Sequence, residues 1–280
     1  MPLDCALPEA TWRARLALGF ERRGERSVLA TREHDGPLVV QKALHPEGPQ
    51  VCHAIVVHPP AGIAAGDQLV IEVAAHEGAH ALITTPGAAK WYRSPGAWAR
   101  QRVSIVARAQ SRVEWLPQET IVFDGARADI QWDARLEGDA RLIAWDIVRL
   151  GRTACGERFA RGELRSTARL WQDGRLAWIE RARIGCEALV GRAGAGLRGE
   201  PVYATLLCAG AGIGDELLAQ CRAVKAAGGE GAVTRLPRVL VARFVGSSTE
   251  AVRDYFLRLW SLLRPAAMER DAAAPRIWST

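Results

Sequence analysis

Short apolar or alternating runs, each bounded by Gly or Pro, recur along this chain and constrain its fold more than any other feature. Alternation places successive side chains on opposite faces, which is typical of β-strands. The runs occupy residues 37–42, 51–58, 68–75, 80–84, 103–107, 112–116, 119–123, 164–171, 176–184 and 239–244, and residues 128–150 add two strands around a turn at 137–139. Many short strands without alternating helices favour a mainly β fold, a coiled two-layer sheet of β-helix-like or sandwich type.

Local turn and helix signals complete this pattern. Asp173-Gly174 stands between two alternating runs and predicts a tight hairpin, because Gly accepts a positive φ. Residues 215–227 favour a helix that stops at two glycines. Residues 248–263 place an apolar stripe on one helical face, and Pro265 is expected to end that helix. We therefore expect two helices in the C-terminal half and a single domain over residues 1–280.

Composition excludes several classes of protein. With 280 residues and 49% hydrophobic content, the chain can bury a large core. No apolar run reaches the roughly 18 residues of a membrane span, and the apolar patch at residues 16–20 is too short for a signal-peptide core. The six cysteines are scattered without a CxxC pair, which favours reduced thiols. We expect a cytoplasmic protein.

The net charge of +6 comes almost entirely from arginine, since only three of the 37 basic residues are lysines. Acidic residues are interleaved with the arginines, and no block of five like charges occurs. This pattern argues against a nucleic-acid partner. Arginine is also the cation preferred at protein interfaces, because its planar fork makes paired hydrogen bonds.

Motifs for common catalytic chemistry are missing from the sequence. It contains neither a P-loop nor a GxSxG elbow. The GxGxxG match at residues 194–199 leads into a strand-like segment, which offers no helix N-terminus for a pyrophosphate. All six histidines lie within the first 80 residues, so a metal-dependent hydrolase built on them remains an alternative of a different class.

Several carboxylates stand in apolar or turn-rich segments, where an unpaired charge is costly. Each must be neutralised by an arginine, hydrogen-bonded or used to bind a metal. Arg149, Arg152, Arg181 or another of the many arginines could fill the first role. The carboxylates concerned are Asp67, Glu119, Asp124, Asp146 and Glu180.

A set of longer motifs carries a resemblance to a known family. In chain order they are PLVVQKALHPEGP (37–49), HPPAGIAAGD (58–67), LITTPGAAKWYRS (82–94), EWLPQETIVFDGA (114–126), LGR (150–152), GERF (156–159), LRP (263–265) and PRIWST (275–280). These blocks span nearly the whole chain, and the sequence resembles the UreD family, called UreH in some organisms.

The resemblance implies a non-catalytic role in urease maturation. UreD proteins form a complex with UreF and, through UreF, with the GTPase UreG, and this complex docks on the urease apoprotein. Nickel is expected to pass through UreF and UreD to the urease metallocentre. The family therefore implies a scaffold and nickel conduit with no permanently bound cofactor and transient Ni²⁺. A pure docking scaffold that never contacts nickel is the alternative within the same class.

The resemblance also implies site residues. The tunnel-lining polar residues of the family fall on Asp67, Asp146 and Glu180 here, which are the expected nickel-path residues. Two positions depart from the family pattern: Ala89 replaces a Ser or Thr, and Ala61 replaces a Gly in a turn. The other family motif positions are Lys90, Tyr92, Arg93, Glu119, Asp124, Arg152 and Glu157.

Overall fold

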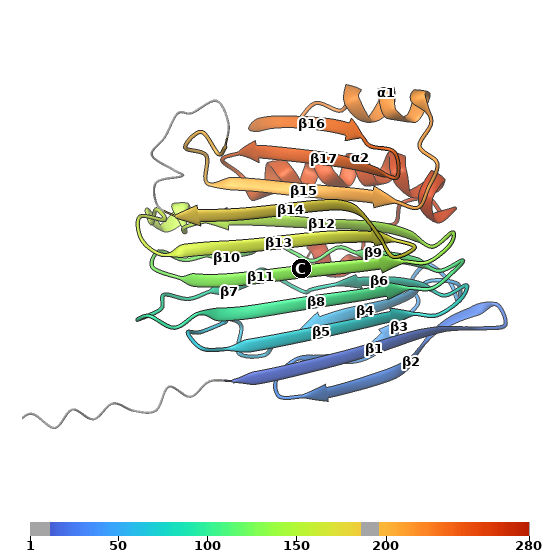
Figure 1. Cartoon of the computed structure of the whole chain (residues 1–280), viewed down its shortest axis with the longest axis horizontal. Coiled ribbons are helices and arrows are strands. Elements are labelled where there is room, and N and C mark those ends of the chain that lie inside the picture. Colours follow the sequence, from blue (N-terminus) through green and yellow to red (C-terminus); the bar gives the residue numbers. More distant parts are fainter. Residues whose placement is uncertain (1–11, 186–195, 280) are drawn as a thin grey trace, which may run out of the picture.

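The computed structural model describes residues 12–185 and 196–279, whose strands form two facing sheets (Figure 1). Seven strands build sheet 1, in the spatial order β14 (Arg175–Gly185), β13 (Glu163–Gln172), β11 (Arg127–Leu136), β8 (Ala99–Ala107), β5 (Gln68–Ala75), β1 (Arg13–Arg23) and β2 (Arg26–Asp35). Ten described strands build sheet 2, in the order β16 (Gly229–Arg235), β17 (Val239–Gly246), β15 (Val202–Ala209), β12 (Arg141–Leu150), β9 (Arg112–Trp115), β6 (His80–Thr84), β4 (Cys52–Val57) and β3 (Val39–Leu44). Beside this path, β10 (Thr120–Val122) pairs with β12, and β7 (Ala89–Trp91) pairs with β10.

Helices cover the face of sheet 2 that points away from sheet 1. In Figure 1, α2 (Thr249–Met268) lies behind β15 and β17, and α1 (Asp215–Ala223) lies next to β16. Two short 3₁₀ helices, η1 (Thr153–Cys155) and η3 (Arg276–Ser279), complete the described elements. No described helix is long and apolar enough to cross a membrane.

The chain coils between the two sheets. Strands β4, β6, β9 and β12 pair in parallel in sheet 2, while β5, β8, β11 and β13 alternate with them in sequence and pair in parallel in sheet 1. The turn at 137–139 therefore links one sheet to the other. Antiparallel hairpins flank the coil, among them β13–β14 around Asp173-Gly174. The predicted coiled, mainly β fold and the predicted hairpin are both confirmed.

Side-chain alternation divides the interior into two cores. On β12, Ile143, Trp145 and Ile147 face α2 and belong to the core between sheet 2 and the helices. Ala144 and Val148 face the opposite way and belong to the core between the sheets. Asp146 shares the parity of this second set, so the fold directs a carboxylate into the space between two apolar layers.

Four of the described strands were absent from the predicted set: β1, β2, β7 and β16. Alternation is interrupted in both of the first two strands, because β1 contains a continuous apolar run at 16–20 and β2 is exposed at every residue of 30–35. β16 is mostly exposed and glycine-rich, yet it pairs with β17 over its whole length. A Cβ on Gly231 would lie 2.6 Å from the Tyr255 ring, so the glycine lets an aromatic side chain cover this weak strand.

Both helices end at different residues than predicted. The expectation that Pro265 ends α2 is wrong, because the helix continues to Met268. Ala267 and Met268 are fully buried there, and their packing outweighs the missing proline N–H. α1 stops at Ala223 instead of 227, because Val224 is extended and the Lys225 carbonyl accepts a hydrogen bond from Arg258 (2.8 Å).

Candidate functional site

A cavity of about 360 Å³ lies between the two sheets. Strands β4, β5, β8, β11, β12, β13, β14 and β15 all contribute to its wall, so it extends across the strands and along the axis of the coil. Its lining is mostly apolar, with residues such as Ile71, Val103 and Leu207. Polar groups that enter this apolar space are costly to bury unless they are paired.

The coil brings Asp146 and Glu180 together from opposite sheets. Asp146 lies on β12 and Glu180 on β14, and both line the cavity. The Thr205 hydroxyl donates to Glu180 at 3.4 Å, and Arg243 Nη2 lies 2.8 Å from Glu180 Oε2. Tyr203 completes this group, which we call the cavity cluster: Asp146, Glu180, Tyr203, Thr205 and Arg243.

Burial and like charge shape the electrostatics of the cavity cluster. Burial, followed by the neighbouring Glu180 charge, raises the pKa of Asp146 to about 6. Burial and the same two carboxylates also raise the pKa of Tyr203, so its hydroxyl stays neutral. That hydroxyl has no hydrogen-bond partner in the described part of the chain. The cluster thus combines excess negative charge with an unused donor and acceptor.

Asp67, the third predicted path residue, lies apart from this pair. It is buried in the turn before β5, where it accepts hydrogen bonds from the backbone N–H of Ala64 (2.8 Å) and Trp12 (3.2 Å). The negative charge of Asp67 favours protonation of His58, which lines the cavity. Burial lowers the pKa of His58, and Asp67 partly opposes that shift. Asp67 therefore shapes the cavity wall, and its role on a nickel path stays a prediction.

The remaining motif carboxylates are paired with arginines. Glu119 forms an ion pair with Arg253 of α2. Asp124 binds Arg161 through Nε (3.1 Å), and although burial opposes it, the hydrogen bonds of Arg161 lower the pKa of Asp124. Glu157 binds Arg152 at 2.6 Å, and that bond, the largest contribution, lowers the pKa of Glu157.

Other motif residues lie around one edge of the cavity region. Lys90 lines the cavity itself. Tyr92 is exposed and packs edge-on against Phe123, and Arg93 reaches Asp124 at 3.7 Å. Glu180 is neutralised by Arg243, one of the many arginines from which a partner was expected.

The two departures from the family pattern occupy different surroundings. Ala61 adopts φ +62°, a left-handed conformation that favours glycine, so this alanine is strained in its turn. Its backbone N–H nevertheless closes the turn onto the His58 carbonyl at 2.9 Å. Ala89 lines the cavity and offers no hydroxyl there.

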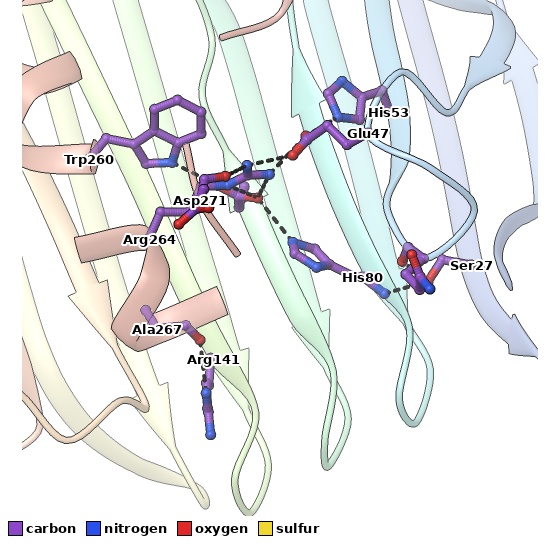
Figure 2. A network of polar contacts seen from close by, with 11 residues as sticks. Ser27, Glu47, His53, His80, Arg141, Trp260, Arg264, Ala267 and Asp271 are labelled. Atoms are coloured by element: carbon purple, nitrogen blue, oxygen red, sulfur yellow. Dashed lines mark hydrogen bonds and ion pairs between the residues drawn. The ribbon is translucent and has the colours of Figure 1, made fainter. Parts of the chain in front are cut away.

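Histidines take part in a second polar group at the other core, which we call the Arg264 network: Glu47, His53, His80, Glu114 and Arg264. Figure 2 labels Glu47, His53, His80 and Arg264. Arg264 is fully buried and binds both Glu47 (2.5 Å) and Glu114 (3.0 Å). His53 contacts Glu47 at 2.7 Å, and His80 contacts Glu114 at 3.0 Å. Within residues 12–185 and 196–279, no three His, Cys, Asp or Glu side chains are grouped as a metal site.

Other sequence candidates are placed as follows. Gly194 of the GxGxxG match lies outside the described residues, and the segment after Gly199 is strand β15, as expected. Of the four cysteines in the described ranges, all have free thiols, and Cys52, Cys208 and Cys221 are buried.

Sequence reasoning missed Tyr203, Thr205 and Arg243. One signal was available: Arg243 is a lone charge inside the apolar run of β17. A charge at an inward-facing position of such a strand requires a partner, although the sequence does not identify it.

The fold and this site define a mainly β protein, a coil of two facing sheets around a mostly apolar cavity that two carboxylates enter. The chain belongs to the UreD family, because the model of the UreD urease accessory protein matches residues 13–279. It is 52% identical over 269 residues to urease accessory protein UreD of Azoarcus sp. (strain BH72), covering 96% of this chain and 94% of the relative. It is also 48% identical to that of Dechloromonas aromatica (strain RCB) and 46% to that of Pseudomonas aeruginosa PAO1, with at least 99% of each chain covered. Its role is in urease maturation.

Proposed function

We propose that this chain conveys Ni²⁺ through the cavity between its sheets while it serves as a scaffold. In this proposal it works in the cytoplasm with UreF and, through UreF, with the GTPase UreG, and it docks on the urease apoprotein. The observation that carries the proposal is the pair Asp146 and Glu180, which enters an apolar cavity from two different sheets, with an arginine paired to Glu180.

The chemistry of this pair suits a passing ion. Ni²⁺ binds most tightly to nitrogen and sulfur ligands, so carboxylates hold it weakly. A conduit needs sites that an ion can enter and leave. A dication would also relieve the like-charge repulsion that contributes to the raised pKa of Asp146. The neutral Tyr203 hydroxyl and Thr205 offer further oxygens beside the pair.

The test replaces each carboxylate by its amide and keeps its shape. Asp146→Asn and Glu180→Gln variants are co-expressed with urease and the other accessory proteins, and the nickel content of purified urease is measured. We expect a several-fold loss of bound nickel while the accessory complex still assembles. The matched control is Asp133→Asn, because Asp133 lies on β11 outside the cavity lining and pairs with Arg169 at 3.3 Å. Normal nickel content in both cavity variants would overturn the conduit.

A pure docking scaffold is the second candidate, favoured by the arginine-paired carboxylates Asp124 and Glu157 beside the exposed Tyr92. It predicts that Tyr92→Ala and Arg93→Ala weaken complex assembly, whereas the cavity variants leave nickel loading intact. Pull-down of the accessory complex together with nickel analysis separates the two candidates.

A further inference from the structure

Arg243 occupies an unusual position at the end of the cavity. Sheet 1 ends at β14, whereas sheet 2 continues beyond it with β15, β17 and β16 (Figure 1). Arg243 shares the parity of Val239 and Val241, which belong to the core between the sheets. It therefore points to the sheet-1 side at a place where β17 has passed the last strand of sheet 1, and it reaches Glu180 on that edge strand.

Strand register places the same arginine in line with the other carboxylate. Asp146 pairs with Thr205 on β15, and Thr205 pairs with Arg243 on β17. Directly paired residues of neighbouring strands project from the same face about 5 Å apart. Asp146, Thr205 and Arg243 thus form a row across sheet 2, and Glu180 faces that row from sheet 1.

The contact that holds Arg243 is weak. Among the described residues its guanidinium makes one ion pair, at 2.8 Å, and its side chain is 54% exposed whereas that of Glu180 is 21% exposed. Arg264 shows the opposite case, since it is fully buried and binds two carboxylates. An exposed, single ion pair exchanges readily, whereas a buried one does not. Arg243 can therefore leave Glu180 and turn into solvent at little cost.

We propose that Arg243 is the resident counter-cation of the cavity carboxylates and acts as an ion-exchange gate. This inference rests on the proposed passage of Ni²⁺ through the cavity. An arriving dication displaces the guanidinium from Glu180 and binds between Glu180 and Asp146. When the ion moves on, the tethered guanidinium returns and neutralises Glu180 again.

A tethered arginine also sets which ions can pass. Its tether keeps the guanidinium at a high effective concentration beside Glu180. A monovalent cation is attracted to Glu180 no more strongly than the guanidinium is. A dication that contacts both carboxylates is attracted more strongly. The gate thus favours dications over sodium or potassium, and it shortens the time that a dication stays.

The experiment measures Ni²⁺ affinity directly, with nickel sulfate as the probe. The full chain, purified in complex with its accessory partner, is titrated calorimetrically at neutral pH and physiological salt. We expect Arg243→Gln to bind Ni²⁺ about tenfold more tightly than the unmodified chain, because the competing cation is gone. Arg243→Lys keeps the charge and should return the affinity to within about twofold of the unmodified chain.

Two controls complete the design. Arg238→Gln removes an exposed arginine that pairs with Asp173 at 3.7 Å near the same end of sheet 2, and it should leave Ni²⁺ affinity unchanged. Arg243→Met provides a second neutral variant should the glutamine fold poorly. In a chelator chase, both neutral variants should release Ni²⁺ more slowly than the unmodified chain.

The outcomes separate this inference from the function on which it rests. If neutral replacements of Arg243 leave affinity and release unchanged while Glu180→Gln abolishes Ni²⁺ binding, the gate is wrong and the conduit stands. If Glu180→Gln and Asp146→Asn change neither Ni²⁺ binding nor urease nickel content, the conduit itself is wrong. Tighter binding in Arg243→Gln that disappears in the Arg243→Gln/Glu180→Gln double variant supports both.

Discussion

The cavity cluster and the Arg264 network contain the same basic components, two carboxylates and one arginine, but differ in how completely these are bonded. In the Arg264 network, Glu114 accepts from His80, from Arg264 and from the Trp260 indole N–H (2.7 Å). Figure 2 shows Arg264 between Glu47 and the Asp271 carbonyl, which accepts from it at 2.5 Å. A fully bonded polar group of this kind stabilises one arrangement of the chain.

The cavity cluster is bonded incompletely. Arg243 is half-exposed, and the buried Tyr203 hydroxyl has no partner among the described residues. The pKa values of the carboxyl groups in the two clusters are accordingly shifted in opposite directions. Although burial opposes it, hydrogen bonds from His53 and Arg264 lower the pKa of Glu47 to about 2, whereas burial and Glu180 raise the pKa of Asp146 to about 6. Complete bonding fixes the fold, and in the proposed function incomplete bonding leaves a place for a passing ion.

The largest expected effect is the loss of Arg264. Arg264→Met leaves two buried carboxylates without their cation and should cost about 3–5 kcal/mol in the free energy of unfolding. The matched change at the cavity, Arg243→Met, should cost less than about 1 kcal/mol. Urea denaturation of both variants measures the difference, and equal costs would break the comparison.

Acid should weaken the Arg264 network through Glu47. Its pKa is near 2 in the folded chain against 4.5 ordinarily, so the stabilisation is complete above pH 4.5 and is lost as pH falls toward 2. The loss should approach about 3 kcal/mol. Unfolding free energies measured across this range should show the slope, and Glu47→Gln, which lacks the titrating group, should flatten it.

Asp146 should show the opposite slope. Because its pKa is raised from 3.8 to about 6, the folded chain binds the proton more tightly, and stability falls as pH rises from 3.8 to 6. Asp146→Asn should therefore stabilise the chain above pH 6, by about 1–3 kcal/mol. A variant that gains stability while losing nickel transfer would mark Asp146 as a functional residue. A destabilised Asn variant would contradict this assignment.

The smallest expected effect concerns the C-terminal segment beside the Arg264 network. Trp278 donates its indole N–H to the Thr84 hydroxyl (2.7 Å) and packs against Trp145 and Trp260. Trp278→Phe keeps an aromatic ring but loses the hydrogen bond, so we expect a cost of about 1 kcal/mol. Thermal melting compares it with Trp12→Phe, which alters an exposed side chain and should change nothing.

Local pattern was enough to predict most of the coil. The bounds of β5 and β6 match the predicted runs at 68–75 and 80–84, and the Asp173-Gly174 hairpin forms as expected. β16 was missed because a glycine-rich, exposed strand lacks alternation and forms through pairing with β17. Pro265 misled the prediction of the end of α2, because helix propensity is local whereas the burial of Met268 is not.

Sequence by itself determined the family, the mainly β class and which carboxylates stand in apolar strands. It also placed Asp146 and Glu180 among the path candidates through motif resemblance. Only the tertiary structure decided which carboxylates are neutralised. Glu114 and Arg264 are 150 residues apart, and Glu180 meets Arg243 across two different sheets. The physical reason is that strand periodicity encodes the face on which a side chain lies, whereas its partner on the facing layer depends on how the coil stacks.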